Sequence, residues 1–311
     1  MRLVALGSAA GGGFPQWNCA CHNCSRFRAG KLRSQARSQA QVVVSVDTSQ
    51  CVLVNASPDL RAQILSSPAL SPSKTPRHTP IASVVLTSAD VDSVAGLLHL
   101  REFQPLTIYA TPSVRRIVQE ENRIFRVLNR ANPPVVWRDL QLNTWFALLP
   151  TSDASDGRAS LRCRAIPLGK TYPDYVSEEL RRALPPGEAV IGLLLEEGNK
   201  RAFYAPALPG GSEEWKGCAR SSDVCLLDGT FWTDDELRST GVGTKTAREI
   251  GHIPLSGPGG MFEQIGPSTG RRRILIHINN TNPILDEDSP ECREVRDAGW
   301  EIAYDGMQID L

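Results

Sequence analysis

Several features typical of membrane, nucleic-acid-binding or secreted proteins are missing from this chain of 311 residues. Lysine plus arginine and aspartate plus glutamate each number 34, so no basic excess is present to bind nucleic acid or an anionic membrane. No apolar run approaches the roughly 18 residues that a membrane span needs, and residues 1–7 resemble a short strand rather than a signal peptide. We therefore expect a cytoplasmic protein with no nucleic-acid partner and no membrane insertion.

Long linkers and low-complexity tracts are also missing. The polar or proline-rich breaks at 132–134 and 151–158 are too short to separate domains. Apolar strand-like runs alternate with helical patterns along the chain, and hydrophobic residues make up 41% of it, which is enough for a large core. The sequence predicts one α/β domain over residues 1–311, built in layers.

A dinucleotide-binding loop is excluded in the glycine-rich segment 7–15, because its spacing is not G-x-G-x-x-G and Pro15 obstructs a following helix. The next segment, 17–24, is more specific. It contains Cys19, Cys21 and Cys24 as C-x-C-x-x-C, a spacing that suits three thiolates on one structural Zn²⁺ ion. His22 is a local candidate for the fourth ligand, although a remote residue would strain the loop less. The alternative is three reduced thiols without metal.

The loop after a predicted buried strand at 81–86 is the centre of the functional prediction. It holds Asp90 and Asp92, and a helix is expected to follow over 94–100. Loops at this end of strands in α/β proteins often hold catalytic groups. The alternative is that both carboxylates only cap the helix.

Polar residues at the ends of other predicted strands extend this pattern. The full set is Asp90, Asp92, Lys170, Asp228, His252 and His277. Carboxylates together with imidazoles are ligands for iron(II), manganese or zinc, so the set predicts a metal site.

At this point the sequence resembles a known family. The arrangement of strand-end residues is similar to that of the metallo-β-lactamase fold. The segments 7–19, 55–59, 228–230, 251–252, 256–261 and 277–285 resemble the B proteins of pyrroloquinoline quinone (PQQ) biosynthesis, and the likeness covers nearly the whole chain. The resemblance implies a four-layer αββα sandwich with a metal site at one edge.

The resemblance also shows where this chain departs from its relatives. The fold family uses H-x-H-x-D-H, and the corresponding residues here are Ser88, Asp90, Asp92 and Ser93. Ser93 departs even from the PQQ B proteins, which usually keep an Asp-His pair, whereas Lys170 occupies the position of a further histidine as it does in that family. The remaining candidate ligands are Asp92, Asp228 and His277, with Asp90 nearby.

The function implied by the resemblance is iron-dependent hydroxylation of the tyrosine ring in a cross-linked Glu–Tyr precursor of PQQ. A soluble carrier of PQQ or its precursor towards the periplasm, with a degenerate metal site, is the alternative. A zinc-dependent hydrolase is disfavoured because histidines are missing at 88, 90 and 93.

The predicted site suggests roles for individual residues. His252 is a candidate general acid or base, and Lys170 could neutralise a substrate carboxylate or pair with Asp228. His277 could ligate the active-site metal or complete the zinc site of the three cysteines. The oligomeric state is left open, with a homodimer as one alternative.

Overall fold

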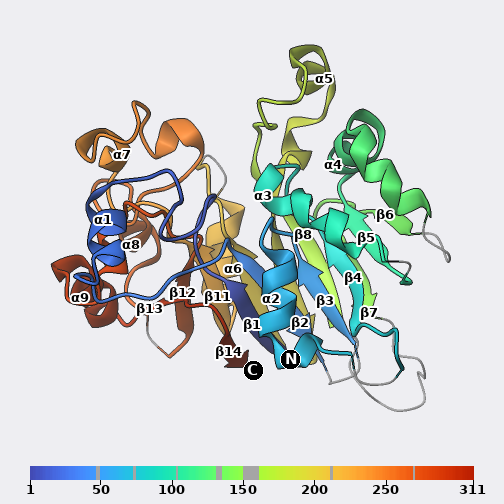
Figure 1. Cartoon of the computed structure of the whole chain (residues 1–311), viewed down its shortest axis with the longest axis horizontal. Coiled ribbons are helices and arrows are strands. Elements are labelled where there is room, and N and C mark those ends of the chain that lie inside the picture. Colours follow the sequence, from blue (N-terminus) through green and yellow to red (C-terminus); the bar gives the residue numbers. More distant parts are fainter. Residues whose placement is uncertain are drawn as a thin grey trace.

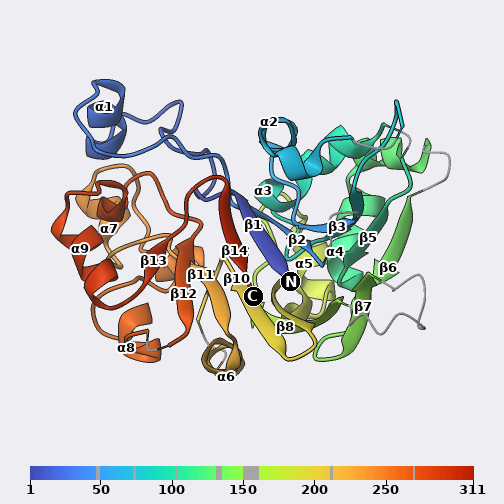
Figure 2. The ribbon, with the colours of Figure 1, turned by 90° about the horizontal axis from the view of Figure 1, so that it is seen from below.

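A computed structural model of the chain describes residues 1–311 except 47–49, 73–74, 103, 131–134, 150–160, 211–212 and 269. It contains two sheets of seven strands that face each other, with helices on their outer faces (Figures 1 and 2). The predicted αββα sandwich is therefore confirmed. The predicted breaks at 132–134 and 151–158 lie outside the described residues.

The first sheet has the order β14-β1-β2-β3-β4-β5-β6. Strands β14, β1, β2 and β3 pair antiparallel, whereas β3, β4, β5 and β6 pair parallel. The bounds are β1 Arg2–Gly7, β2 Gln41–Ser45, β3 Cys51–Val54, β4 Ile81–Val85, β5 Thr107–Ala110, β6 Val136–Asp139 and β14 Met307–Asp310. The two termini lie close together because the first and last strands are neighbours (Figure 1).

The second sheet has the order β13-β12-β11-β10-β9-β8-β7. Here β7 to β10 pair antiparallel, and β10 to β13 pair parallel. The bounds are β7 Trp145–Leu149, β8 Leu161–Gly169, β9 Val190–Glu197, β10 Lys200–Ala205, β11 Val224–Asp228, β12 Arg272–Ile276 and β13 Glu301–Ile302. Each sheet thus has parallel strands whose carboxyl ends can bring loops together at one edge.

Short helices connect and cover the sheets. The α-helices are α1 His22–Arg28, α2 Leu60–Ser66, α3 Val91–Val94, α4 Pro112–Arg116, α5 Glu178–Ala183, α6 Glu214–Ser221, α7 Glu236–Ser239, α8 Met261–Ile265 and α9 Pro290–Asp297. Segments of 3₁₀-helix lie at Pro68–Leu70, Ala95–Leu100, Arg123–Arg130, Pro186–Glu188, Arg248–Ile250 and Pro283–Leu285, and a π-helical turn lies at Ile117–Glu121. Among the described residues, no helix has the length and apolar character to cross a membrane.

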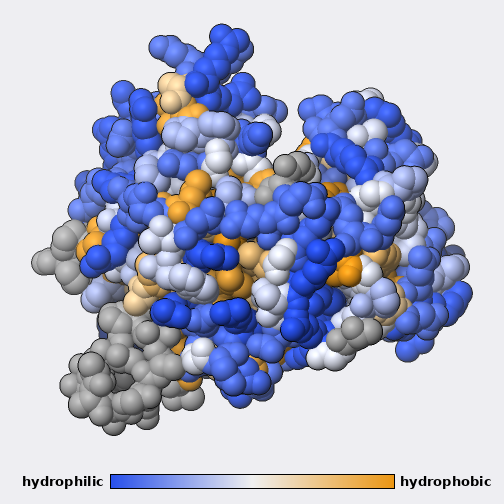
Figure 3. Space-filling view, turned by 180° about the vertical axis from the view of Figure 1, so that it is seen from behind, coloured by the Kyte–Doolittle hydropathy of each residue, from blue (hydrophilic) through white to orange (hydrophobic). Residues whose placement is uncertain are grey.

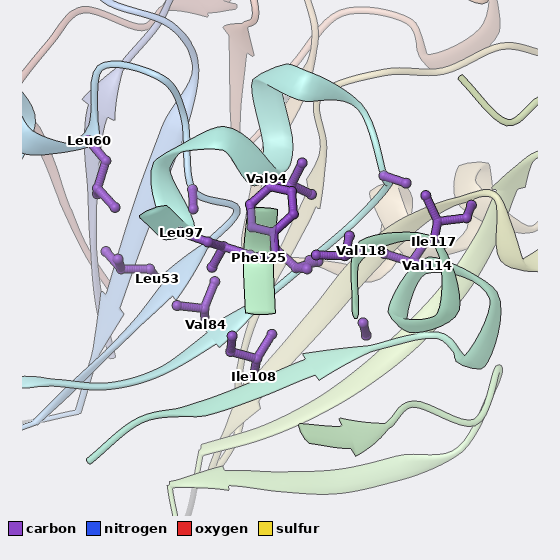
Figure 4. Close-up of a cluster of buried hydrophobic side chains, with 14 of the residues drawn as sticks. Leu53, Leu60, Val84, Val94, Leu97, Ile108, Val114, Ile117, Val118 and Phe125 are labelled. Carbon is purple, nitrogen blue, oxygen red and sulfur yellow. The ribbon is translucent and has the colours of Figure 1, made fainter. Parts of the chain in front are cut away.

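Apolar side chains are buried in three layers. One cluster lies between the sheets, where alternate residues of facing strands meet, as at Leu3, Val54 and Leu193. A second packs α2, α3 and α4 on the first sheet. In Figure 4, Val84 and Ile108 of that sheet lie beneath Leu97 and Phe125. A third packs α1, α6, α8 and α9 against the second sheet. Burial of apolar area on both faces of each sheet is what holds the four layers together.

Most predicted strands occur where the alternation of apolar residues placed them. The strand at 107–110 has the expected bounds, and the hairpin over 41–46 and 51–54 forms, although most of its turn lies outside the described residues. The helix starts were less well predicted. The Ser57-Pro58 pair is typical of a helix start, but α2 begins at Leu60, and the Ser57 hydroxyl donates to Gln63 instead.

Candidate functional site

Asp228 and His277 come together because their strands are parallel neighbours. Asp228 ends β11 and pairs in register with Ile276, the last residue of β12, so His277 follows directly beside it. His252 reaches the same place from the loop after Arg248–Ile250. Gly251 allows the chain to turn there at a φ of +92°. One ligand atom from each of Asp228, His252 and His277 lies within 4.8 Å of the others.

His277 has left-handed backbone geometry, with a φ of +62°. Such geometry is uncommon for a residue with a side chain and costs about 1 kcal/mol or more. It is held in place because the Thr230 hydroxyl meets the His277 carbonyl at 2.9 Å and the next amide, of Ile278, donates to the Ser8 carbonyl at 3.0 Å. The surrounding structure therefore directs this imidazole into the cluster.

The cluster is tightly hydrogen-bonded. The Thr230 hydroxyl lies 2.6 Å from Oδ1 of Asp228 and 2.8 Å from Nδ1 of His277, and Nδ1 of His252 lies 2.8 Å from Oδ2 of Asp228. The Leu208 and Thr230 amides also donate to this carboxylate. The two imidazole rings stack at 5.3 Å between centroids. These contacts fix the orientation of both rings, as partners of metal-binding histidines commonly do.

Charge states in the cluster suit a divalent cation. Burial would raise the pKa of Asp228, but the charge and hydrogen bond of His252, with further help from His277 and Thr230, hold that pKa below its usual value. Burial lowers the pKa of His277 to about 4, with His252 adding to the effect and Asp228 opposing it. A carboxylate beside a neutral imidazole is the state in which these groups bind metal.

The loop that the fold family uses for metal binding corresponds to residues 88–93. Here its side chains form hydrogen bonds with one another. The Ser88 hydroxyl donates to Oδ2 of Asp90 at 2.7 Å and lies 3.0 Å from the Ser93 hydroxyl. Asp90 precedes α3 but makes no capping hydrogen bond with its side chain, so the simple capping alternative does not describe it.

Asp92 differs from Asp90 in its burial and its pKa. Burial raises the pKa of Asp92 to about 6, and the charges of Asp90 and Asp59 add to the effect. Its carboxylate lies so close to the backbone of Gly11 that a Cβ there would meet Oδ2 at 2.5 Å. Asp92 is outside the group formed by the two histidines and Asp228.

One cavity of about 680 Å³ joins these parts. Its walls include Asp90, Asp92 and Ser93 from the first half of the chain and His252 and His277 from the second. The loops that carry them emerge at the end of the sandwich opposite the termini (Figure 1). Figure 3 shows the surface hollowed there, between the projection that bears α5 and the one that bears α7.

Lys170 does not line this cavity. It follows the last residue of β8 and its side chain is exposed. The pairing with Asp228 that the sequence suggested is not formed, because the oxygen atoms of Asp228 are bonded to Thr230, Leu208 and His252. A role for Lys170 toward a substrate carboxylate remains a prediction.

A second cluster consists of Cys19, Cys21 and Cys24, whose sulfur atoms lie within 4.8 Å of one another at the start of α1. The side-chain amide of Asn280 covers them, with Nδ2 at 3.1, 3.4 and 3.5 Å from the three sulfurs. His22 is exposed and lies 3.4 Å from Arg26, outside this cluster, and His277 belongs to the other one.

The segment 277–282 links the two clusters. Its first residue, His277, faces Asp228, whereas Asn280 faces the cysteines. Asn282 donates to the carbonyls of Gly229 and Thr230, which fixes the segment against the end of β11. Sequence reasoning missed Asn280 and Thr230. The signal available was the run of asparagine and threonine directly after a strand, which offers more hydrogen-bonding groups than a turn needs.

Comparisons with known proteins agree with this architecture. A family model described as a beta-lactamase superfamily domain matches residues 50–278. Over their full lengths, this chain is 42% identical to the coenzyme PQQ synthesis protein B of Pseudomonas protegens and 42% identical to that of Nitrosococcus oceani. The chain belongs to the coenzyme PQQ synthesis protein B family.

A solved member of the family has the same structure. The zinc-bound PqqB of Methylobacterium extorquens is 40% identical, with a TM-score of 0.89 and complete coverage of both chains. A diphosphatase of the PhnP family, at 19% identity and a TM-score of 0.65, shares the fold alone. The family resemblance inferred from the motifs is thus confirmed.

Proposed function

We propose that this member of the family acts in PQQ biosynthesis as an iron-dependent hydroxylase of the tyrosine ring in a cross-linked Glu–Tyr precursor. The observation that carries the proposal is the group of Asp228, His252 and His277, whose ligand atoms lie within 4.8 Å of one another in the wall of a 680 Å³ cavity. Two histidines and one carboxylate are the protein ligands of many non-haem iron(II) oxygenases.

The donor set fits such an ion. The Asp228 carboxylate is ionised and His277 is neutral, so both groups are in the state that binds a metal. Bound iron(II) would supply activation of dioxygen. Thr230 would keep both rings oriented through its contacts with their Nδ1 atoms, at 2.8 Å for His277 and 3.1 Å for His252.

The reaction replaces a ring C–H bond by C–OH. It takes one oxygen atom from dioxygen, and the other leaves as water with two electrons from an external reductant and two protons. Asp92 is suited to proton transfer, because its carboxylate lines the cavity and the structure records no hydrogen bond to it within the described residues. Because His252 is proposed here as a metal ligand, Asp92 is the better candidate for this role.

The cysteine cluster supports a separate, structural zinc site. In a tetrahedral site with three thiolates, an oxygen ligand lies roughly 3.5 Å from each sulfur, given bond lengths of about 2.3 Å for Zn–S and 2.0 Å for Zn–O. The terminal amide group of Asn280 already lies at 3.1 to 3.5 Å. A turn of the amide would present its oxygen to the ion, and we assign Asn280 as the fourth ligand.

The hydroxylase proposal is tested by loading the protein with iron(II) without oxygen, then adding the Glu–Tyr diamino acid, ascorbate and oxygen. We expect a product 16 mass units heavier, roughly one oxygen consumed per product, and loss of both in Asp228→Asn and His277→Ala. His99→Ala, which removes an exposed histidine from the first half of the chain, is the control. Wild-type protein that binds iron but gives no product would refute the proposal.

The carrier alternative rests on one observation, which is that Ser88, Asp90 and Ser93 bond to one another where relatives of the fold have ligands. It predicts tight binding of PQQ to metal-free protein, measurable by calorimetry. Absence of such binding would exclude it.

A further inference from the structure

The cavity extends past the metal-binding cluster into the space between the two sheets. Its inner wall is formed by buried residues that the proposed chemistry does not use: Ala40, Asn55, Thr87, Ile191 and Tyr204. Tyr204 comes from β10 and is only 1% exposed. Its hydroxyl has no hydrogen-bond partner in the described part of the chain.

An unpaired buried hydroxyl is costly, by about 1–3 kcal/mol, unless a ligand or water meets it. The Asn55 side chain lies nearest to the phenol oxygen, but its carbonyl oxygen already accepts two hydrogen bonds from Thr87 and so cannot accept one from the Tyr204 hydroxyl. The Asn55 side chain donates to the Thr87 hydroxyl at 2.9 Å and accepts from the Thr87 amide at 2.8 Å. Burial raises the pKa of Tyr204 far above its usual value, with only partial compensation from Asn55, so the phenol stays protonated and can donate.

Charge is distributed unevenly along the cavity. Its two cationic residues among those described, Lys245 and Arg248, are both exposed at the outer end. The inner wall therefore offers one free O–H donor without a positive charge. A carboxylate at that depth would lose its hydration for a single hydrogen bond, which is unfavourable, whereas a phenol or carbonyl oxygen loses far less.

We propose that the Tyr204 hydroxyl is a substrate-recognition group that donates a hydrogen bond to an uncharged oxygen on the ring of the substrate. The ring would enter between the sheets, against Ala40 and Ile191, while the charged ends of the substrate remain near Lys245 and Arg248. Because Tyr204 would touch the ring oxygen, it sets which rings bind and which way they face. This inference rests on the proposed function for the identity of the ring.

The test compares two ligands on two proteins by calorimetry. The protein is zinc-loaded so that no turnover occurs. The ligands are the Glu–Tyr diamino acid and the same compound with phenylalanine in place of tyrosine. We expect wild-type protein to bind the phenolic ligand about five- to tenfold more tightly than the other, the usual size of one hydrogen bond. Tyr204→Phe should bind both ligands equally.

Tyr109→Phe is the matched control. Tyr109 belongs to the same cluster of side chains between the sheets and stacks on Phe146, but it does not line the cavity. It should keep the wild-type preference. Tyr204→Phe should also keep the metal content of the wild type and should not lower its thermal stability, since the lost hydroxyl has no partner in the described residues.

Equal weakening of both ligands by Tyr204→Phe, no effect on either, or no binding of either ligand to wild-type protein would overturn the inference. Its failure is distinguishable from that of the proposed function. A preference that depends on Tyr204 without any oxygen uptake by the iron-loaded protein would refute the hydroxylase alone. Hydroxylation that continues with no such preference would refute only the role of Tyr204.

Discussion

Glu236 gives a prediction whose size follows from the structure. This carboxyl at the start of α7 is only 4% exposed, and burial raises its pKa from 4.5 to about 7 despite hydrogen bonds from Thr281 and from the amides of Trp232 and Thr233. Since the folded protein holds this proton more tightly than the unfolded chain does, the contribution to stability is complete below about pH 4.5. It is lost as the pH rises through about 7.

The expected loss is about 3.5 kcal/mol, from 2.5 pKa units at about 1.4 kcal/mol per unit. Glu236→Gln should abolish this loss of stability at high pH, because glutamine has no proton to release. Glutamine reproduces the protonated acid, because its oxygen can accept from the Trp232 amide and its nitrogen can donate to the Thr281 hydroxyl. The variant should lie within about 1 kcal/mol of wild-type stability at pH 5 and exceed it by up to about 3.5 kcal/mol at pH 8.

Urea unfolding at pH 5, 6, 7 and 8 measures the difference, with equal metal content verified in each sample. Glu179→Gln, which changes an exposed glutamate in α5, is the control and should follow the wild-type curve. A difference between Glu236→Gln and wild type that is the same at every pH would refute the reasoning, because a shifted pKa must produce a slope.

Four further substitutions test the two proposed metal sites and the role of Asp92. Asn280→Ala should weaken zinc binding at least about tenfold in a chelator competition, whereas His22→Ala should leave it unchanged; the reverse result would show that the histidine is the ligand. Ser93→His should raise iron affinity by about tenfold or more, because it adds an imidazole to the cavity wall, and an unchanged affinity would contradict this. Gly11→Ala should displace Asp92 and lower turnover while zinc content stays constant, since its Cβ would lie 2.5 Å from Oδ2, and normal turnover would exclude Asp92 from the chemistry.

The sequence predicted the layers well because burial leaves a strong pattern. Runs such as 224–227 and 274–276 are apolar throughout, as strands covered on both faces must be, and both form central parallel strands. The segment expected to be one helix over 112–128 was predicted less well. It contains α4, a π-helical turn and a 3₁₀ segment, because packing of Val118, Phe125 and Leu128 on the sheet determines its path.

The candidate site was only partly accessible from sequence. Strand ends placed Asp228 and His277 correctly beside each other, since parallel register brings them together. The position of His252 depends on a loop that folds back to β11, and no local pattern encodes that contact. Asn280 was missed for a similar reason. Its role depends on α1 packing beside the segment after β12, where the Asn23 side chain donates to the Asn280 carbonyl at 3.1 Å.

The positions of Asp228, His252 and His277 show how this chain could bind a metal without the first-loop histidines that the resemblance implies. Asp228 ends a strand of the second sheet, His252 and His277 lie in loops of that sheet, and their contacts with Thr230 and Leu208 are also within that half. Ser88 and Ser93 can therefore bond to each other and to Asp90 without disturbing the cluster. The first loop still closes the cavity, because the Ile191 amide donates to the Thr87 carbonyl at 2.9 Å and so joins the two sheets at the site. The second half of the chain holds two imidazoles and a carboxylate in one place, so a metal site built on them would not need an imidazole at position 93.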